Sequence, residues 1–245
     1  AGEQWNLAFE KAGFKNAIII KQQPDDAEWD AGDIRYNVLR WTSSPFPPFG
    51  GYGPSFVNPR TGQILGADIM LEYVALTNRL RTEKLFEKAG LDLLENSEEN
   101  YFDHDIHSCN AAEFSQLNNL FAKTSLIALG ESKMEESKMI KEYLHYLILH
   151  EMGHTLGLNH NMKSSQLHSI NDIHNEEKTK EIGLIGSVMD YPSVNISLDR
   201  NKQGQYWSTR PGPYDVWAIQ FAYQPRKSEK ETEQLLSKST LPELT

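Results

Sequence analysis

One stretch of the chain, residues 149–162, holds side chains whose types and spacing suit metal-dependent chemistry. It contains His150, Glu151, His154, Gly157 and His160, which form the pattern H-E-x-x-H-x-x-G-x-x-H. Residues four apart on a helix share one face, so His150 and His154 can bind the same ion. Gly157 can adopt a positive φ and end the helix, and the chain can then turn back and bring in a third imidazole from His160.

Three imidazoles and one open position are the ligand set of a catalytic zinc, whereas structural zinc is usually closed by four protein ligands. We therefore predict one zinc ion, bound by His150, His154 and His160. A water molecule in the open position would have a pKa of roughly 7. Glu151 lies next to the first ligand and is predicted to be the general base. The alternative is an ordinary surface helix, but the added glycine and third histidine argue against chance.

The motif resembles the zinc signature of the metzincin clan of metallopeptidases, which also has a methionine-containing Met-turn further along the chain. Residues 187–191 read S-V-M-D-Y and resemble the S-x-M-x-Y form of that turn. The resemblance implies that Met189 is an apolar floor beneath the zinc. It also implies that Tyr191 is an extra ligand or a transition-state donor. Without the zinc motif, Met189 would be read as a core methionine and Tyr191 as a turn residue.

Residues 33–41, 52–55 and 58–65, with His160 and Asn161, are similar to the bacterial Met-zincin domain family. Members are usually much longer, so the resemblance implies that this chain is part of a longer protein. It also implies export to the periplasm, the cell surface or the medium.

The expected fold is α+β and metzincin-like, with a small, twisted, mostly antiparallel sheet and helices in a single catalytic domain over residues 1–245. An N-terminal lobe, 1–157, would end with the zinc helix, and a smaller C-terminal lobe, 158–245, would hold the Met-turn and the last helix. Hydrophobic spacing and turn residues predict the elements. Helices are expected at 3–12, 74–89, 111–129, 132–154 and 213–223, strands at 17–21 and 34–41, a hairpin at 56–73, and a surface helix or frayed tail at 226–245.

The second arm of the hairpin, residues 64–70, resembles the edge strand that metzincins hold above their zinc. Gly66 and Ala67 are small enough to let a substrate backbone approach and pair with the edge. The alternative is an ordinary covered strand. The proline- and glycine-rich segment 43–54 either lines a cleft or packs its aromatic side chains on the core.

The composition of the chain argues against several classes of binding partner. The formal net charge is −10 without a basic run, which argues against nucleic acid and anionic membranes. No apolar run reaches the ~20 residues of a membrane span. Cys109 is the single cysteine, so it forms no intramolecular disulfide. A solvent-loop or small core thiol is favoured over a latency ligand for zinc, because its neighbours show no ligand motif. A polar loop is likewise favoured over a second metal site at Asp103, His104, Asp105 and His107.

These observations predict a zinc-dependent endopeptidase acting on a peptide or protein substrate. Glu151 would take a proton from water and pass it to the leaving amine, and the specificity pocket would lie near residues 191–194. Two alternatives stay open: a zinc hydrolase of a non-protein amide, and a non-catalytic peptide-binding module. Glu151 speaks against the second, since a pure binder needs no base beside its metal.

Overall fold

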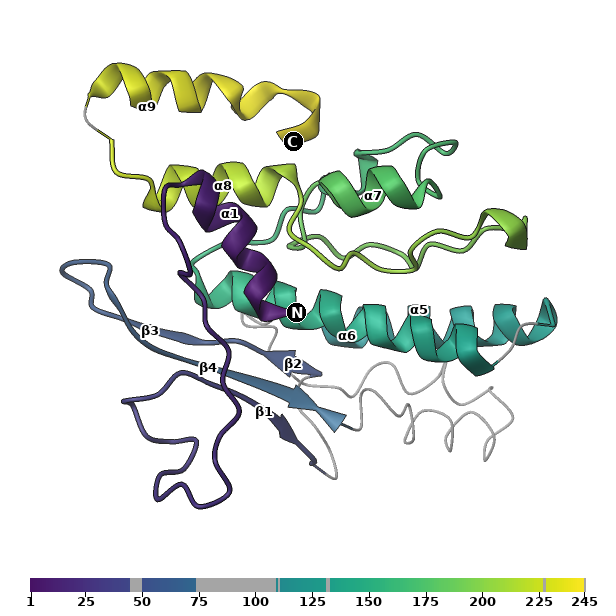
Figure 1. Cartoon of the computed structure of the whole chain (residues 1–245), viewed down its shortest axis with the longest axis horizontal. Coiled ribbons are helices and arrows are strands. Elements are labelled where there is room, and N and C mark those ends of the chain that lie inside the picture. Colours follow the sequence, from purple (N-terminus) through teal and green to yellow (C-terminus); the bar gives the residue numbers. More distant parts are fainter. Residues whose placement is uncertain (45–49, 74–108, 110, 131–132, 227, 245) are drawn as a thin grey trace, which may run out of the picture.

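A computed structural model describes residues 1–44, 50–73, 109, 111–130, 133–226 and 228–244 (Figure 1). Within these ranges the chain is a mixed α+β protein, as predicted, with a small four-stranded sheet and six α-helices. The α-helices are α1 (Asn6–Lys11), α5 (Ala111–Ala128), α6 (Lys133–Thr155), α7 (Glu176–Ile182), α8 (Pro213–Tyr223) and α9 (Glu229–Leu236). Short 3-10 helices are η1 (Gly2–Trp5), η2 (Ser164–Gln166), η3 (Arg200–Lys202), η4 (Ser237–Thr240) and η5 (Pro242–Leu244).

The sheet contains β1 (Val38–Thr42), β2 (Gly51–Tyr52), β3 (Ser55–Val57) and β4 (Ile64–Glu72). β4 is central: it pairs in parallel with β1 on one side, and antiparallel with β2 and β3 on the other. The hairpin prediction is confirmed by the β3–β4 pair. The edge-strand prediction for residues 64–70 fails for residues 68–70, where β4 pairs with β1, whereas the described strands pair with residues 64–67 on the β3 side only. The sheet is also mixed, since its longest pairing, β1 with β4, is parallel.

The long helix α6 organises the molecule, with the strands on one side of it and α7, α8 and α9 on the other (Figure 1). Its sequence explains this position, because apolar side chains recur at helical spacing and are buried at Met139, Tyr143 and Leu147. Tyr146 is buried on the same face as Met139, whereas the buried Leu149 lies nearly opposite Leu147 and extends the covered surface. α6 is therefore sandwiched between layers, which fixes the direction of the side chains in its last two turns.

The N-terminal segment packs against both α6 and the end of the chain. The indole Nε1 of the buried Trp5 donates a hydrogen bond to Leu149 O, 3.2 Å away. α1 lies beside α8 (Figure 1), where Gln220 Nε2 donates to Lys11 O at 3.0 Å. The helix predicted at 3–12 is thus confirmed as η1 followed by α1. The single-domain and two-lobe division stays a prediction.

Two strand predictions near the N-terminus fail for local reasons. Residues 17–21 form no strand: the Ile19 and Ile20 side chains are 65% and 54% exposed, and Ile20 N–H donates to a side-chain oxygen of Glu3. The strand predicted at 34–41 begins only at Val38. Before it, the Asp33 carboxylate accepts a bond from Arg35 N–H, which holds a turn in place of extended backbone.

The remaining helix predictions mostly hold. α5, α6 and α8 confirm the helices predicted at 111–129, at the motif and at 213–223. The polar tail contains α9, which docks on α8 through the Trp217 Nε1–Leu235 O hydrogen bond of 2.9 Å. The predicted helix at 74–89 lies outside the described residues. No described helix has both the length and the apolar character needed to cross a membrane.

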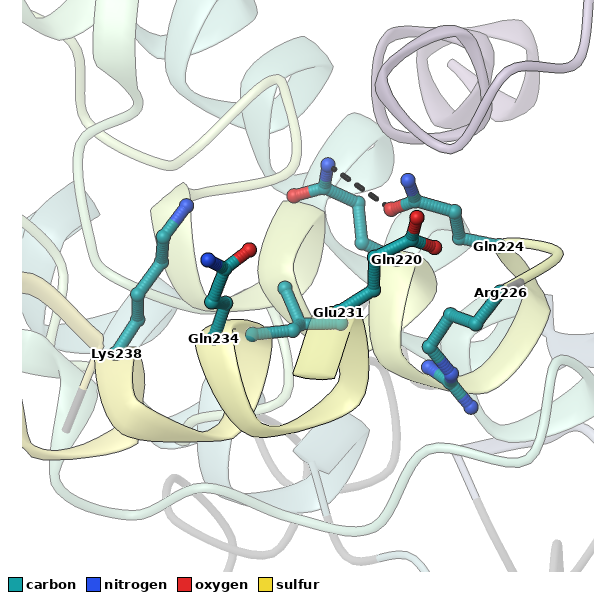
Figure 2. A pocket seen from close by; sticks show the side chains of 7 residues that line it. Gln220, Gln224, Arg226, Glu231, Gln234 and Lys238 are labelled. Carbon is teal, nitrogen blue, oxygen red and sulfur yellow. Dashed lines mark hydrogen bonds between the residues drawn. The ribbon is translucent and has the colours of Figure 1, made fainter. Parts of the chain in front are cut away.

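A pocket of about 210 Å³ lies between α8 and α9 (Figure 2). Polar and charged side chains line it, among them Gln220, Arg226, Glu231 and Lys238. None of the motif histidines borders it, so it is separate from the candidate site.

Candidate metal centre

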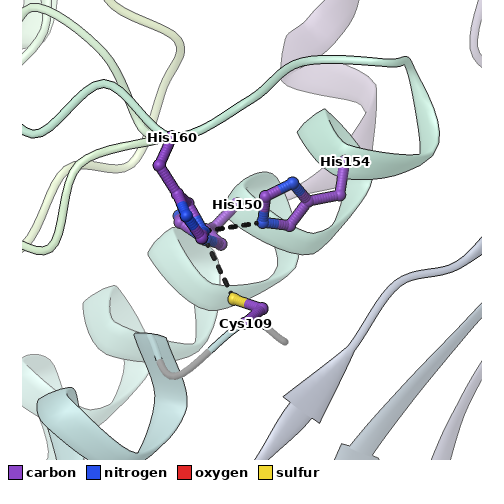
Figure 3. Close-up of side chains that lie close together, drawn as sticks. All are labelled: Cys109, His150, His154 and His160. Carbon is purple, nitrogen blue, oxygen red and sulfur yellow. Dashed lines mark hydrogen bonds between the residues drawn. The ribbon is translucent and has the colours of Figure 1, made fainter. Parts of the chain in front are cut away.

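The last turns of α6 bring His150 and His154 onto one face, and the following turn adds His160 (Figure 3). Gly157 has φ +87°, and Leu158 N–H donates back to Gly153 O at 3.0 Å, which ends the helix as predicted. After this turn His154 Nε2 and His160 Nε2 lie only 3.0 Å apart. The structure therefore gathers all three predicted ligands.

Backbone carbonyls orient two of these rings. His150 Nδ1 lies 2.7 Å from Val188 O, and His154 Nδ1 lies 3.0 Å from Leu158 O. A carbonyl oxygen only accepts, so each Nδ1 carries the proton and each neutral ring turns the lone pair of its Nε2 into the cluster. Burial lowers the pKa of His154 to about 4 and the pKa of His150 well below its ordinary value. Neutral imidazoles with converging lone pairs fit a bound cation.

Cys109 lies at the site, although the sequence favoured the other interpretation of this thiol over a zinc ligand. Its side chain is buried and points into the cluster, with Sγ 3.2 Å from His150 Nε2 (Figure 3). Ligand atoms of Cys109, His150, His154 and His160 all lie within 4.8 Å of one another. Of the two thiol environments that the sequence favoured, the solvent loop is wrong and the buried thiol is confirmed. No local sequence pattern could reveal this position, because residue 109 is brought to α6 only by tertiary structure.

Glu151 is fully buried beside these ligands. Oε1 lies 3.6 Å from Cys109 Sγ, and Oε2 has no hydrogen-bond partner among the described residues. Burial raises the pKa of this carboxyl to about 8 in the absence of a cation. A buried carboxylate oxygen without a protein partner is suited to holding a water molecule or its proton.

Met189 lies directly against α6. It is fully buried, and a Cβ added to Gly153 would lie 2.2 Å from its sulfur. A side chain at position 153 would therefore force the buried Met189 side chain to shift. Met189 thus contacts α6 next to His154, whereas its predicted place beneath the zinc and the function of the turn stay predictions.

The backbone around Met189 is held by Asp215 of α8. This buried carboxylate accepts bonds from Ser187 Oγ at 2.6 Å and from Val188 N–H and Gly212 N–H, each at 2.8 Å. Val188 O in turn is the acceptor for His150 Nδ1. The first motif histidine is thus connected to α8 through a single peptide segment.

Tyr191 reaches the same cluster. Its hydroxyl lies 3.0 Å from His160 Nε2 and 3.5 Å from Cys109 Sγ, and Phe114 of α5 stacks against its ring. The structure thus places the predicted tyrosine beside the proposed metal ligands.

Other predicted positions are not gathered at this site. Gly66 and Ala67 pair with Phe56 and Ser55 of β3 on one side, and on the other side Ala67 N–H donates to Asn37 Oδ1 at 2.9 Å. Their contact with substrate stays a prediction. The alternative metal site at residues 103–107 lies outside the described residues.

Comparison with known protein families gives a match to the region that contains this site. Residues 132–243, which include the histidine motif and Met189, match the family model described as Met-zincin. This match supports a metzincin-like family and indicates a zinc metallopeptidase. No curated protein and no solved structure matches the chain. The resemblance noted for residues 33–65 lies outside the matched range.

Proposed function

From the Met-zincin match over residues 132–243 and the converging histidines, we propose that the chain is a zinc-dependent endopeptidase. The observation that carries the proposal is the orientation of the rings. Two Nδ1–H groups are engaged by carbonyls, and the opposite Nε2 atoms face one another 3.0 Å apart or lie beside Cys109. His150, His154 and His160 would hold one zinc ion.

When bound, zinc would polarise the scissile carbonyl and lower the pKa of a water molecule. Glu151 would accept the proton of that water through its unpartnered Oε2 and deliver it to the leaving amine. Tyr191 would donate its hydroxyl hydrogen to the developing oxyanion, from its place beside His160. Val188 and Leu158 would keep two imidazoles in the tautomer that binds metal.

A peptide would reach Glu151 past β2. A Cβ on Gly51 of β2 would lie 2.7 Å from Glu151 Oε1, so β2 lies next to the proposed general base. In the described strand order β2 is terminal, which leaves its outer backbone groups as a candidate for pairing with an extended peptide. This route replaces the one first expected along β4. A peptide or protein substrate, export, and membership in a longer chain are parts of the proposal that rest on the family resemblance.

The test is Glu151→Gln compared with wild type and with Glu136→Gln, a control on the first turn of the same helix. The glutamine keeps the size of the side chain but accepts no proton. We expect zinc content near one per chain in all three proteins. Turnover of a protein substrate should fall at least ~10²-fold only in Glu151→Gln.

Normal turnover by Glu151→Gln would refute the role of base. A panel that includes peptides and cell-wall amides would separate an endopeptidase from a hydrolase of other amides. Wild-type protein that binds peptides with full zinc content but cleaves no member of the panel would support a binding module instead.

A further inference from the structure

We propose that Cys109 is the fourth protein ligand of the metal ion, so that the resting site is closed to water and the enzyme is latent. The inference rests on the proposed zinc site, and it adds a regulatory step to it. Four donor atoms, three imidazole nitrogens and one sulfur, point toward one another in Figure 3 and lie within 4.8 Å.

Two of the spacings between these atoms are close to those around a tetrahedral ion. With metal–nitrogen bonds of ~2.0 Å and a metal–sulfur bond of ~2.3 Å, tetrahedral ligand atoms are roughly 3.3–3.5 Å apart. Cys109 Sγ lies 3.2 Å from His150 Nε2, and His154 Nε2 lies 3.0 Å from His160 Nε2. All four ligand atoms lie within 4.8 Å of one another, so small side-chain movements would bring the sulfur and the imidazoles around one ion.

The neighbours of the thiol strengthen this assignment. Cys109 Sγ also lies 3.6 Å from Glu151 Oε1 and 3.5 Å from Tyr191 Oη. These are the two groups proposed to handle the water and the oxyanion, so the sulfur lies where the reacting atoms would have to be.

Activation then follows as a ligand exchange. The sulfur–metal bond breaks, the thiolate takes a proton from solvent, and a water oxygen takes the vacated position. No oxidant is needed. A closed set of one cysteine and three histidines is otherwise typical of structural zinc, whereas hydrolysis requires the open position. Any agent that holds Cys109 away from the ion would raise activity.

The experiment replaces zinc by cobalt(II) in wild type, Cys109→Ala and Ser115→Ala. Ser115 is a buried residue of α5 outside the cluster, so its variant also deletes one buried side-chain atom. Wild type and Ser115→Ala should show a near-ultraviolet sulfur-to-cobalt charge-transfer band, and Cys109→Ala should lack it. Chelator competition should show zinc affinity at least about tenfold lower in Cys109→Ala, because one ligand is lost.

Activity provides the second measurement. The zinc form of Cys109→Ala should cleave a protein substrate with kcat/KM at least about tenfold above wild type and Ser115→Ala. The reason is that the sulfur no longer reduces the fraction of molecules in which the metal has an open position for substrate. A wild-type cobalt protein without the sulfur band overturns the ligand assignment, and leaves the proposed function standing if the zinc enzyme is active. A sulfur band with no activity in any variant supports the ligand and overturns the proposed function. Equal activity of wild type and Cys109→Ala overturns latency.

Discussion

The hydroxyl of Tyr191 would have different partners before and after displacement of Cys109. In the described structure it contacts His160 Nε2 and Cys109 Sγ, at 3.0 and 3.5 Å. Displacement of the cysteine would leave the hydroxyl facing the position of the reacting carbonyl. A group that donates mainly to the developing oxyanion stabilises the transition state more than the ground state.

We expect Tyr191→Phe to lower kcat by about 10- to 1000-fold, with KM and zinc content little changed. The ring and its stacking on Phe114 are retained, so only the hydroxyl is tested. Steady-state kinetics and a zinc assay on this variant are sufficient. If kcat is unchanged and zinc binding weakens, the tyrosine is a resting-state ligand only. If both are unchanged, it has a packing role.

Tyr191, 31 residues from His160, was predicted only through the resemblance of residues 187–191 to a known turn. The three histidines and Glu151 could be predicted from the sequence because their spacing along the chain is local. Cys109 could not, since it is 41 residues away from His150 and has no patterned neighbours. Its buried position depends on how α5 packs against α6. The carbonyl partners Val188 and Leu158 were missed for a related reason, because backbone acceptors leave no residue-type signature.

Residues 187–189 and α8 form a connected unit around Asp215. Burial raises the pKa of this carboxyl from 3.8 to about 6, and its three hydrogen bonds oppose the shift. The folded chain therefore holds this proton more tightly than the unfolded chain. The stability gained from protonation is fully present below about pH 3.8 and is lost as the pH rises through about 6.

Asp215→Asn removes this titration while keeping an acceptor for Val188 N–H and Gly212 N–H. We expect the unfolding free energy of wild type minus that of the variant to increase by on the order of 1 kcal/mol from pH 8 to pH 5. Denaturant unfolding at both pH values measures the difference. Both proteins retain the same metal ligands, so metal-linked pH effects cancel. A pH-independent difference would contradict the raised pKa.

Strands were less predictable than helices in this chain. α6 has buried side chains at helical spacing over several turns, so its existence and direction follow from the pattern. The apolar run at 17–21 has high strand propensity, but the side chains of Glu3 and Asn6 bond its backbone instead. The central place of β4 was also hidden, because the partner of a strand is not encoded in its own alternation.

The proposed ligands come from separate parts of the molecule. Cys109 precedes α5, His150 and His154 lie on α6, and His160 follows the Gly157 turn. A ligand that binds only the folded chain stabilises it by about 2.7 kcal/mol at 100 times its Kd. Removal of zinc should therefore affect the whole molecule and not the site alone.

We expect a chelator to lower the Tm of the zinc-loaded protein by about 5–10 °C. Differential scanning calorimetry at fixed protein and free zinc concentrations measures the shift. His154→Ala, which loses a ligand, should show little or no response to the same chelator. A wild-type Tm that is insensitive to chelation would argue against a folded-state zinc site.

The position of Cys109 just before α5 has a further consequence for the dynamics of that helix. The chain has no second cysteine to form an intramolecular disulfide, yet a sulfur–metal–nitrogen bridge to His150 would link the start of α5 to α6 across 41 residues of the folded chain. Such a link would oppose local opening of α5. Release of the sulfur would therefore remove the link between α5 and α6 at the same time as it opens the site. With zinc present, amide hydrogen exchange in α5 should be faster in Cys109→Ala than in wild type, and equal rates would refute the crosslink.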